Sequence, residues 1–400
     1  MVARSTVALV HCSSYDERTV SAAVERGIGL LGGMAGFIHP DEKIVLKPNV
    51  LVGDAPEKLV GPHPLVFKAV AQLARAILPT PPSPYGSSAG GVGKTPHLSY
   101  GDSPSFGRVE GHMQRAGFAQ HAQALGIPLA DFEGGQEVHF PDSPFIKQFV
   151  LAHGVLAADG LISISKFKAH QLTRITGPIK NQFGCVPGML KAQFHVRLPD
   201  PLDFARMLVC LNLYIRPRLY VLDGIMAMEG NGPRSGDPVA MNVLLFSRDP
   251  VALEAVMCRL IDLDPQHVPT LAPGREWGLG TYLQEEIELL GDPLEPLVNK
   301  EFRVVRGPAK LGTRSALMPA IRDLVAPRPV IDPSRCSQCG TCVRLCPVVP
   351  KAVAWHGGDR TRPPEHHYAR CIRCFCCQEM CPERAISVVT PLLGRLLQPR

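Results

Sequence analysis

The chain has 400 residues, 45% of them hydrophobic, which is enough for two or three domains with a sizeable core. Its net charge of +6 suits an anionic ligand or an acidic partner and does not indicate nucleic-acid binding. No stretch approaches the roughly 18 uninterrupted apolar residues of a membrane helix, and residues 1–12 lack the pattern of a signal peptide. We therefore expect a soluble, cytoplasmic protein with neither a membrane nor a nucleic acid as its partner.

The first elements alternate between strand and helix. Residues 6–11 form a β-branched apolar run that predicts a strand, and residues 17–31 have a helical apolar period. A second strand is predicted at residues 43–46, followed by a helix at 64–78 that begins with proline. This order is typical of the beginning of an α/β sheet.

Residues 79–97 are rich in Pro, Ser and Gly and read as an insertion. They include GGVGKT at residues 90–95, which resembles a phosphate-binding loop. That motif needs Gly where Ser88 stands, and a helix after Thr95, where Pro96 follows instead. The insertion is the better interpretation.

The middle of the chain continues the alternation up to a linker. Apolar runs predict strands at 160–165, 219–222 and 242–246, and helices at 109–125, 202–213, 250–262 and 268–279. We expect an α/β domain over residues 1–310, with a mixed or mostly parallel sheet and flanking helices. A linker is predicted at 311–329, a small C-terminal α+β domain at 330–390 and a tail at 391–400.

A basic segment, residues 166–195, directly follows the predicted strand at 160–165. It holds seven cationic or titratable bases and no Asp or Glu: Lys166, Lys168, His170, Arg174, Lys180, Lys191 and His195. The end of a strand in an open α/β sheet is a common place for a ligand. Lys and Arg would bind carboxylate or phosphate oxygens, and His would exchange a proton near neutral pH. The alternative is a solvated basic loop.

Residues 223–237 form a second candidate segment, in which four glycines permit close approach of the backbone to a ligand. The spacing of these glycines is not the dinucleotide fingerprint, so it predicts no nicotinamide or flavin site. Asp223 and Glu229 either pair with the lysines or cap loops. Two weaker segments, 47–49 and 101–104, follow predicted strands at the same sheet edge. The candidate substrate-binding residues are Lys47, Asn49, Lys166, Asn181, Asp223, Glu229 and Asn231.

Thirteen cysteines divide into two kinds. Cys12, Cys210 and Cys258 lie in apolar runs and are expected in the core, whereas Cys185 lies in the basic segment, where lysines would stabilise a thiolate. The other nine lie between residues 336 and 381 and include two runs of C-x2-C-x2-C-x3-C-P.

Each of these two runs is the pattern of a bacterial ferredoxin, in which the fourth cysteine binds the other cluster. We therefore predict two 4Fe-4S clusters. Cluster one takes Cys336, Cys339, Cys342 and Cys381, and cluster two takes Cys371, Cys374, Cys377 and Cys346. Zinc sites and disulfides are the weaker alternatives. Cys376 fits neither run and is expected to be a bystander near cluster two.

Several of these stretches together resemble the domain-of-unknown-function family 362, in the form with a C-terminal dicluster ferredoxin domain. The resemblance covers about residues 6–390 and rests on the segments 47–49, 101–104, 166–170, 176–184, 223–233 and 249–252. It implies an iron-sulfur protein with an α/β domain and redox work. The sequence departs from the resemblance at Glu254, where Asp is expected, and in the length of the insertion.

Our leading hypothesis is a ferredoxin-dependent reductase. A ferredoxin or flavodoxin-type donor would pass single electrons through the two clusters to an anionic or carbonyl-bearing small molecule, such as one with an activated double bond. Lys168 and Lys180 would stabilise the developing negative charge, each by about 3 kcal/mol if well placed. His170 would donate the proton.

Two other functions fit the same residues. The chain could be an electron carrier or assembly partner whose cationic face docks an acidic protein. It could also be a non-redox enzyme in which the clusters sense oxygen or stabilise the fold. None of these hypotheses needs a flavin, although a flavin is compatible with the sequence because flavin sites often lack a short motif.

Overall fold

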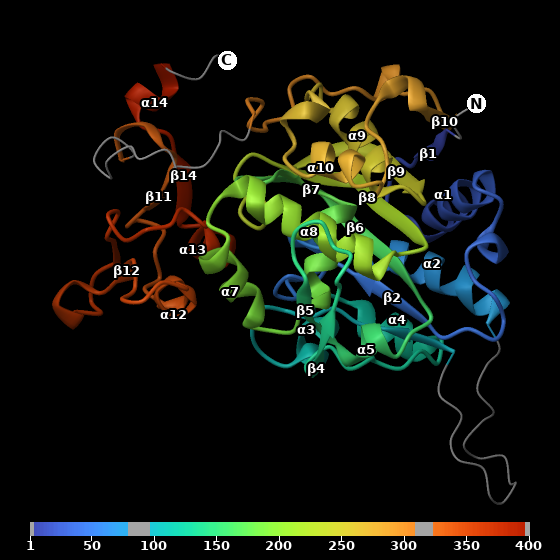
Figure 1. Cartoon of the computed structure of the whole chain (residues 1–400), viewed down its shortest axis with the longest axis horizontal. Coiled ribbons are helices and arrows are strands. Elements are labelled where there is room, and N and C mark those ends of the chain that lie inside the picture. Colours follow the sequence, from blue (N-terminus) through green and yellow to red (C-terminus); the bar gives the residue numbers. More distant parts are fainter. Residues whose placement is uncertain (1–3, 79–96, 309–322, 397–400) are drawn as a thin grey trace, which may run out of the picture.

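The computed structural model describes residues 4–78, 97–308 and 323–396. The predicted insertion, apart from residue 97, lies outside these ranges, as does most of the predicted linker. The main sheet of the described chain has eight strands: β1 (Ser5–His11), β2 (Ile44–Pro48), β3 (Leu98–Tyr100), β6 (Gly160–His170), β7 (Arg174–Thr176), β8 (Leu219–Glu229), β9 (Asp237–Ser247) and β10 (Ile287–Gly291) (Figure 1).

The strand order is β10-β1-β9-β8-β6-β2-β3, and β7 pairs with β6. Strands β8, β6, β2 and β3 run parallel to one another, whereas β9 is antiparallel to both of its neighbours. The predicted α/β class, with its mixed and mostly parallel sheet, is confirmed. The ends of β1, β8, β6, β2 and β3 therefore meet at one edge, which is where the candidate residues after these strands gather.

Helices cover both faces of this sheet: α1 (Glu17–Leu30), α2 (Pro64–Ile77), α3 (Val109–Arg115), α4 (Phe118–Ala124), α5 (His153–Leu156), α6 (Pro178–Asn181), α7 (Leu190–Arg197), α8 (Pro201–Ile215), α9 (Pro250–Leu260) and α10 (Leu271–Glu276). Tyr220 of β8 donates to Asn212 of α8. Tyr220 is paired with Ser247 of β9, so these two side chains lie on the same face of the sheet. Phe246, the residue before Ser247, lies on the opposite face, against Gly27 of α1. Helices α8 and α1 thus lie on opposite faces, which explains why β6 and β8 are buried almost throughout.

Strands β6, β8 and β9 are longer than the sequence predicts, and the first two carry candidate site residues. Strand β6 continues through Lys166 and Lys168 to His170, and β8 continues to Glu229, so the basic segment begins inside the sheet. The sequence is misleading here because lysine and glycine are rare in central strands. The lysines are tolerated because each has buried partners, described below. The helix predicted at 109–125 is also two helices, α3 and α4, separated at Gly117, whose φ is +77°.

The C-terminal domain consists of short elements around the cysteines. They are β11 (Arg328–Ile331) paired with β14 (Ile386–Val389), β12 (Val353–Ala354) paired with β13 (Glu365–His366), and the helices α12 (Thr341–Leu345), α13 (Cys376–Glu379) and α14 (Leu392–Leu396). Helix α14 lies in the predicted tail. A separate hairpin, β4 (Gly135–His139) with β5 (Gln148–Ala152), lies on the main domain. None of the helices in the described ranges has the length and apolar character that a membrane span requires.

The C-terminal domain docks on the loop that follows β8. Gln378 of α13 donates to Asn231 O at 2.8 Å, and Asn231 Nδ2 donates to Ile386 O at 3.0 Å. Arg234 donates to Met380 O and forms an ion pair with Asp54 at 2.7 Å. The side of the domain that carries α13 therefore faces the main sheet (Figure 1).

Candidate functional site

Two cavities in the C-terminal domain are each lined by four of the predicted cluster ligands. The first, of about 330 Å³ including space open to solvent, is lined by Cys336, Cys339, Cys342 and Cys381. The second, of about 310 Å³ measured in the same way, is lined by Cys346, Cys371, Cys374 and Cys377. Each set combines three cysteines of one run with the fourth of the other. In the described part of the chain no three His, Cys, Asp or Glu side chains are grouped to hold a single ion. Sulfurs spaced around a cavity suit a 4Fe-4S cluster better than one zinc ion, and the ligand assignment stays a prediction.

Backbone N–H groups donate to Cys346 and Cys381, the two cysteines that each line the cavity of the opposite run. The N–H of Ala352 donates to Cys346 Sγ, and the N–H of Ala385 donates to Cys381 Sγ, both at 3.3 Å. Hydrogen bonds to ligand sulfurs are one of the factors that set the potential of an iron-sulfur cluster. The cavities and their donors therefore fit the group that the sequence predicts.

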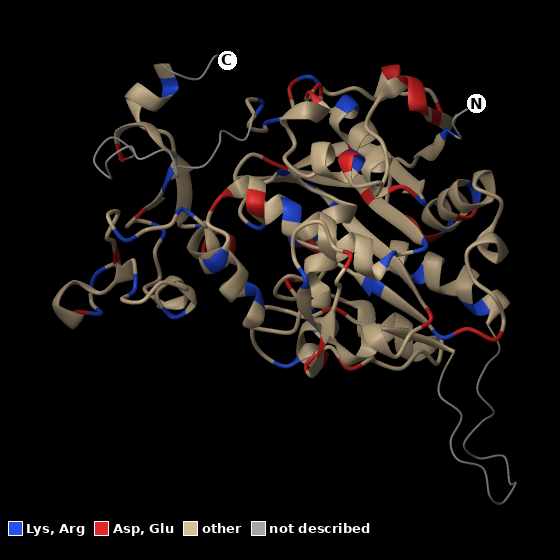
Figure 2. Cartoon of the chain, in the orientation of Figure 1, with Lys and Arg blue, Asp and Glu red and all other residues tan. Residues whose placement is uncertain are grey.

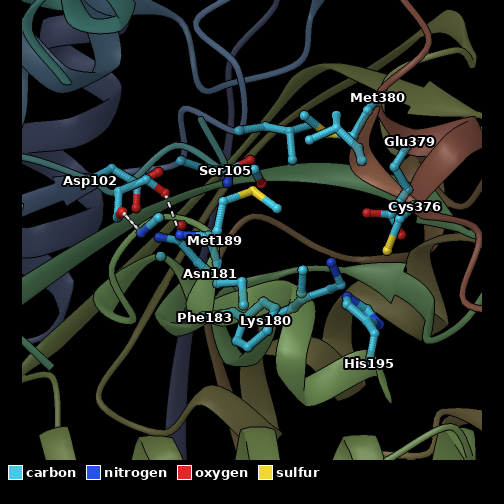
Figure 3. Close-up of a pocket in the computed structure, with 18 residues that line it drawn as sticks. Asp102, Ser105, Lys180, Asn181, Phe183, Met189, His195, Cys376, Glu379 and Met380 are labelled. Atoms are coloured by element: carbon cyan, nitrogen blue, oxygen red, sulfur yellow. Dashed lines mark hydrogen bonds between the residues drawn. The ribbon is translucent and has the colours of Figure 1, made fainter. Parts of the chain in front are cut away.

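A third cavity lies between the two domains. It measures about 750 Å³, including its open mouth. Its walls include Asn49, Ser103, Lys180, Asn181, Phe183, Lys191 and His195 from the main domain and Leu345, Cys376, Glu379 and Met380 from the C-terminal domain. We refer to it as the interdomain cavity. Figure 3 shows Lys180 pointing toward Cys376 and Glu379, with His195 beside it.

Local structure fixes the main-domain wall. Helix α6 carries Lys180 and Asn181 and begins at Pro178. The carboxyl group of Glu254 lies at its first turn and accepts from the N–H of Ile179 at 2.9 Å. His195, on α7, stacks on Phe204 with a centroid distance of 4.5 Å, and burial lowers its pKa to about 4. His195 is therefore neutral near pH 7.

Lys180 is the cation that the interdomain cavity leaves available. Among the described residues, its Nζ has neither a hydrogen bond nor an ion pair. The charge of Lys180 lowers the pKa of Glu379. Burial alone would raise that pKa, but Lys180 and His170 together hold it below its usual range. Lys180 can therefore bind an anionic group of a ligand without giving up a protein partner.

His170 lies behind the cavity wall, not in it. Its Nδ1 accepts from the N–H of Leu172 at 3.0 Å, and its Nε2 lies 3.1 Å from Glu379 Oε1, away from the line of an ideal hydrogen bond. Burial, reinforced by Lys180, lowers the pKa of His170 to about 4. The predicted proton donor is thus neutral, buried and placed to hold Glu379.

The other predicted lysines already have buried partners. Lys47 forms an ion pair with Asp102 at 2.7 Å and donates to Asn181 Oδ1 at 3.0 Å. Lys166 forms an ion pair with Asp223 at 2.9 Å. Burial and these neighbours explain how charged side chains lie inside the sheet, since each charge is compensated.

Lys168 and Lys191 are bound mainly to neutral groups. Lys168 donates to Asn49 Oδ1 at 2.7 Å and to Val60 O at 2.6 Å. Burial, together with Lys180 and Lys166, lowers the pKa of Lys168 to about 7. Lys191 donates to the carbonyls of Ser103 and Val186. The lysines of the basic segment therefore do not form a flat cationic surface.

The structure brings only part of the predicted site together. Three predicted residues line the interdomain cavity: Asn49, Lys180 and Asn181. The remaining seven do not: Lys47, Lys166, Lys168, His170, Asp223, Glu229 and Asn231. Glu229 instead pairs with Arg303 at 2.7 Å, and Asn231 belongs to the joint between the domains. Cys185 is buried, and burial raises the pKa of its thiol to about 12, so it stays protonated.

The sequence alone did not identify the C-terminal wall. Cys376 is the one cysteine between residues 336 and 381 that belongs to neither run, and Glu379 is the one acidic residue inside the second run. The extra cysteine and the single acidic residue can both be read from the sequence. Neither shows which side of a ferredoxin-like domain will face a partner, because that depends on how the domains dock.

Comparison with known proteins agrees with this architecture. Residues 44–259 match the family described as "Domain of unknown function (DUF362)", and residues 328–382 match the 4Fe-4S dicluster domain. The chain is 36% identical over 295 residues to the thylakoid-associated protein sll1697 of Synechocystis sp. (strain ATCC 27184 / PCC 6803 / Kazusa), covering 74% of this chain and 86% of that protein. The dicluster match indicates an iron-sulfur, metal-binding protein of electron transfer.

Proposed function

The chain belongs to the DUF362 family and ends in a 4Fe-4S dicluster domain, and on these grounds we propose that it is a ferredoxin-dependent reductase of a small molecule. One observation carries the proposal: the interdomain cavity has walls from both domains. A substrate in it would touch Lys180 on one side and the chain between the cluster-two ligands Cys374 and Cys377 on the other. The clusters, when bound, supply one-electron storage between a carrier and this cavity.

The substrate class follows from the cavity wall. Lys180 would bind a carboxylate or the oxygen of a carbonyl group, and Asn49 and Asn181 offer amide groups beside it. Phe183 and Met380 add apolar surface for a carbon skeleton. We therefore propose an anionic or carbonyl-bearing molecule with an activated double bond.

The reaction consumes two electrons and two protons. The π bond of the substrate breaks, two C–H bonds form, and a reduced one-electron carrier of the ferredoxin or flavodoxin class is oxidised twice. Lys180 would stabilise the negative charge that develops on the substrate oxygen, by about 3 kcal/mol for one well-placed donor. Lys180, which lines the cavity, would also supply one of the protons, since His170 and His195 are both neutral.

Two of the roles predicted from the sequence change in this proposal. Lys168 fixes Asn49 in the cavity wall, and His170 fixes Glu379. Both act on residues of the wall and neither touches the cavity. A role as a carrier that docks an acidic protein on the basic segment is less favoured, because most cations of that segment are buried.

The experiment uses the holoprotein, purified anaerobically and reduced chemically. It is mixed with a panel of α,β-unsaturated carboxylates and α,β-unsaturated carbonyl compounds, and oxidation of the clusters is followed by absorbance. We expect at least one compound to accelerate oxidation, and Lys180→Gln to slow that step about 100-fold, equivalent to about 3 kcal/mol. Lys43→Gln, which changes an exposed lysine, is the matched control. The site assignment is wrong if Lys180→Gln and His170→Ala both leave turnover of the true substrate unchanged.

The compartment is a separate proposal. We propose the cytoplasm, where thiolates stay reduced. The relative is named for association with the thylakoid, so fractionation of cells into soluble and membrane fractions would test the proposal directly.

A further inference from the structure

The predicted cluster ligands are unequally exposed. In the first cavity Cys339 is exposed, Cys336 is half-buried and the other two ligands are buried. In the second cavity Cys374 is half-buried and the other three ligands are buried, so only the first cavity has an exposed ligand. The neighbours of Cys339 on its N-terminal side, Ser337 and Gln338, are exposed as well. The cavity of cluster one therefore reaches solvent at residues 337–339.

The cavity of cluster two is turned toward the main domain. Phe375, between two of its cysteines, is buried in the core of the main domain, and Cys376 lines the interdomain cavity. The cluster-one end of the dicluster domain is thus exposed to solvent, and the cluster-two end faces the candidate substrate site. Electrons that reach the substrate through cluster two must enter the protein elsewhere, and residues 337–339 are the exposed approach to cluster one.

Arginine side chains flank this exposed approach. Arg344 is exposed and donates through Nη1 to Cys339 O at 3.2 Å, so its guanidinium is held beside the exposed cysteine. Arg335 is exposed on the other side and lies within 3.5 Å of Glu383 O. Lys351 donates to Arg344 O at 3.1 Å and adds a third cation nearby. The acidic neighbours are Asp332 and Glu383.

The whole domain has the same sign of charge. Residues 328–396 contain ten Lys or Arg and five Asp or Glu, a difference of +5 before any cluster charge is counted, compared with +6 for the whole chain. Figure 2 shows Lys and Arg at many points of this domain and Asp and Glu at few. A partner with a negative surface would be steered toward it.

We propose that the surface formed by Arg335, residues 337–339 and Arg344 is the docking site of an acidic, single-electron carrier protein. This inference rests on the proposed function for its direction, from the exposed cluster to the cavity. It differs from docking on the basic segment, where three of the four lysines are buried. Redox complexes are small and transient, so we expect modest affinity that falls as salt rises.

The test measures binding of the full-length holoprotein to an oxidised, acidic 2Fe-2S ferredoxin by titration calorimetry, without substrate. We expect Arg335→Glu with Arg344→Glu to raise the dissociation constant at least tenfold, which is about 1.4 kcal/mol. The control is Arg206→Glu on α8 with Arg216→Glu directly after this helix, two exposed arginines of the main domain with the same change of charge. Those substitutions should change the dissociation constant less than twofold.

Three results would overturn the proposal: equal loss of affinity in both double variants, no loss in Arg335→Glu with Arg344→Glu, or no binding of the wild-type protein at low salt. Iron content, measured on each variant, ensures that a loss of affinity does not reflect a lost cluster. Because no turnover is measured, failure of the reductase proposal leaves this result standing. Conversely, absence of binding by the wild-type protein, together with intact oxidation of its pre-reduced clusters by substrate, would reject the docking surface alone.

Discussion

His170 Nε2 lies 3.1 Å from Glu379 Oε1, and this contact joins strand β6 of the main domain to helix α13 of the dicluster domain. Both side chains are buried, and both lie beside the cation Lys180. The contact therefore belongs to the interface between the domains and supports Glu379, which lines the interdomain cavity.

Replacing His170 tests this dual position. His170→Ala would leave the Glu379 carboxylate buried without its imidazole, so we expect the free energy of unfolding to fall by about 1–3 kcal/mol. Urea unfolding followed by circular dichroism measures the change. His170→Gln, which keeps an N–H donor of similar reach, should recover part of the loss. Equal stability of His170→Ala and the wild type would show that Lys180 alone compensates Glu379.

Each predicted cluster takes its fourth cysteine from the other run, and this arrangement leads to a prediction about iron content. Cys346→Ala and Cys381→Ala should each damage the cluster whose other three ligands lie in the opposite run, and lower the iron from about eight to about four per chain. Cys376→Ala is the matched control, because Cys376 lines neither cluster cavity, and it should keep about eight. Iron and sulfide analysis after anaerobic purification measures this. The assignment would be contradicted if the electron paramagnetic resonance signal of reduced cluster two persisted in Cys346→Ala, or that of cluster one in Cys381→Ala.

Gly184 is a packing position that supports the cavity. A Cβ there would overlap Asp102 Oδ1 and lie 2.8 Å from Lys47 Nζ. Gly184→Ala should therefore separate the buried pair of Lys47 and Asp102 and destabilise the fold by roughly 3 kcal/mol, as expected when one partner of a buried pair loses the other. Gly29→Ala on helix α1 meets nothing within 4 Å and should be neutral or slightly stabilising. Thermal unfolding of the two variants compares them.

Glu254 makes stability depend on pH. Burial raises its pKa from 4.5 to about 8, despite hydrogen bonds from Ile179 and Thr270. The folded protein therefore binds a proton here that the unfolded chain has released, and stability from this group falls as pH rises from about 4.5 to about 8. Glu254→Gln keeps both hydrogen-bonding contacts without an ionisable group, so its unfolding midpoint should vary less over this range. An unchanged pH profile would mean that Glu254 titrates normally.

The sequence predicted those parts of the molecule that depend on local pattern. The α/β class follows from apolar runs such as 160–165, and the two cavities with four cysteines each follow from the spacing of the runs. The burial of Lys47, Lys166 and Lys168 did not follow, because their partners Asp102, Asp223 and Asn49 are distant in the sequence. A pattern that reads as a cationic surface can equally be a set of compensated charges inside a sheet, and only the register of the strands decides between them.

Helix α13 contributes to the walls of two cavities. Cys377 lines the cluster-two cavity, and Cys376 and Glu379 line the interdomain cavity. Damage to cluster two by oxygen would therefore deform the interdomain cavity, which we propose as the substrate site. A preparation handled in air should lose ligand affinity together with its colour. For the same reason, transplanting a dicluster domain from another protein would require this one helix turn to be carried over unchanged.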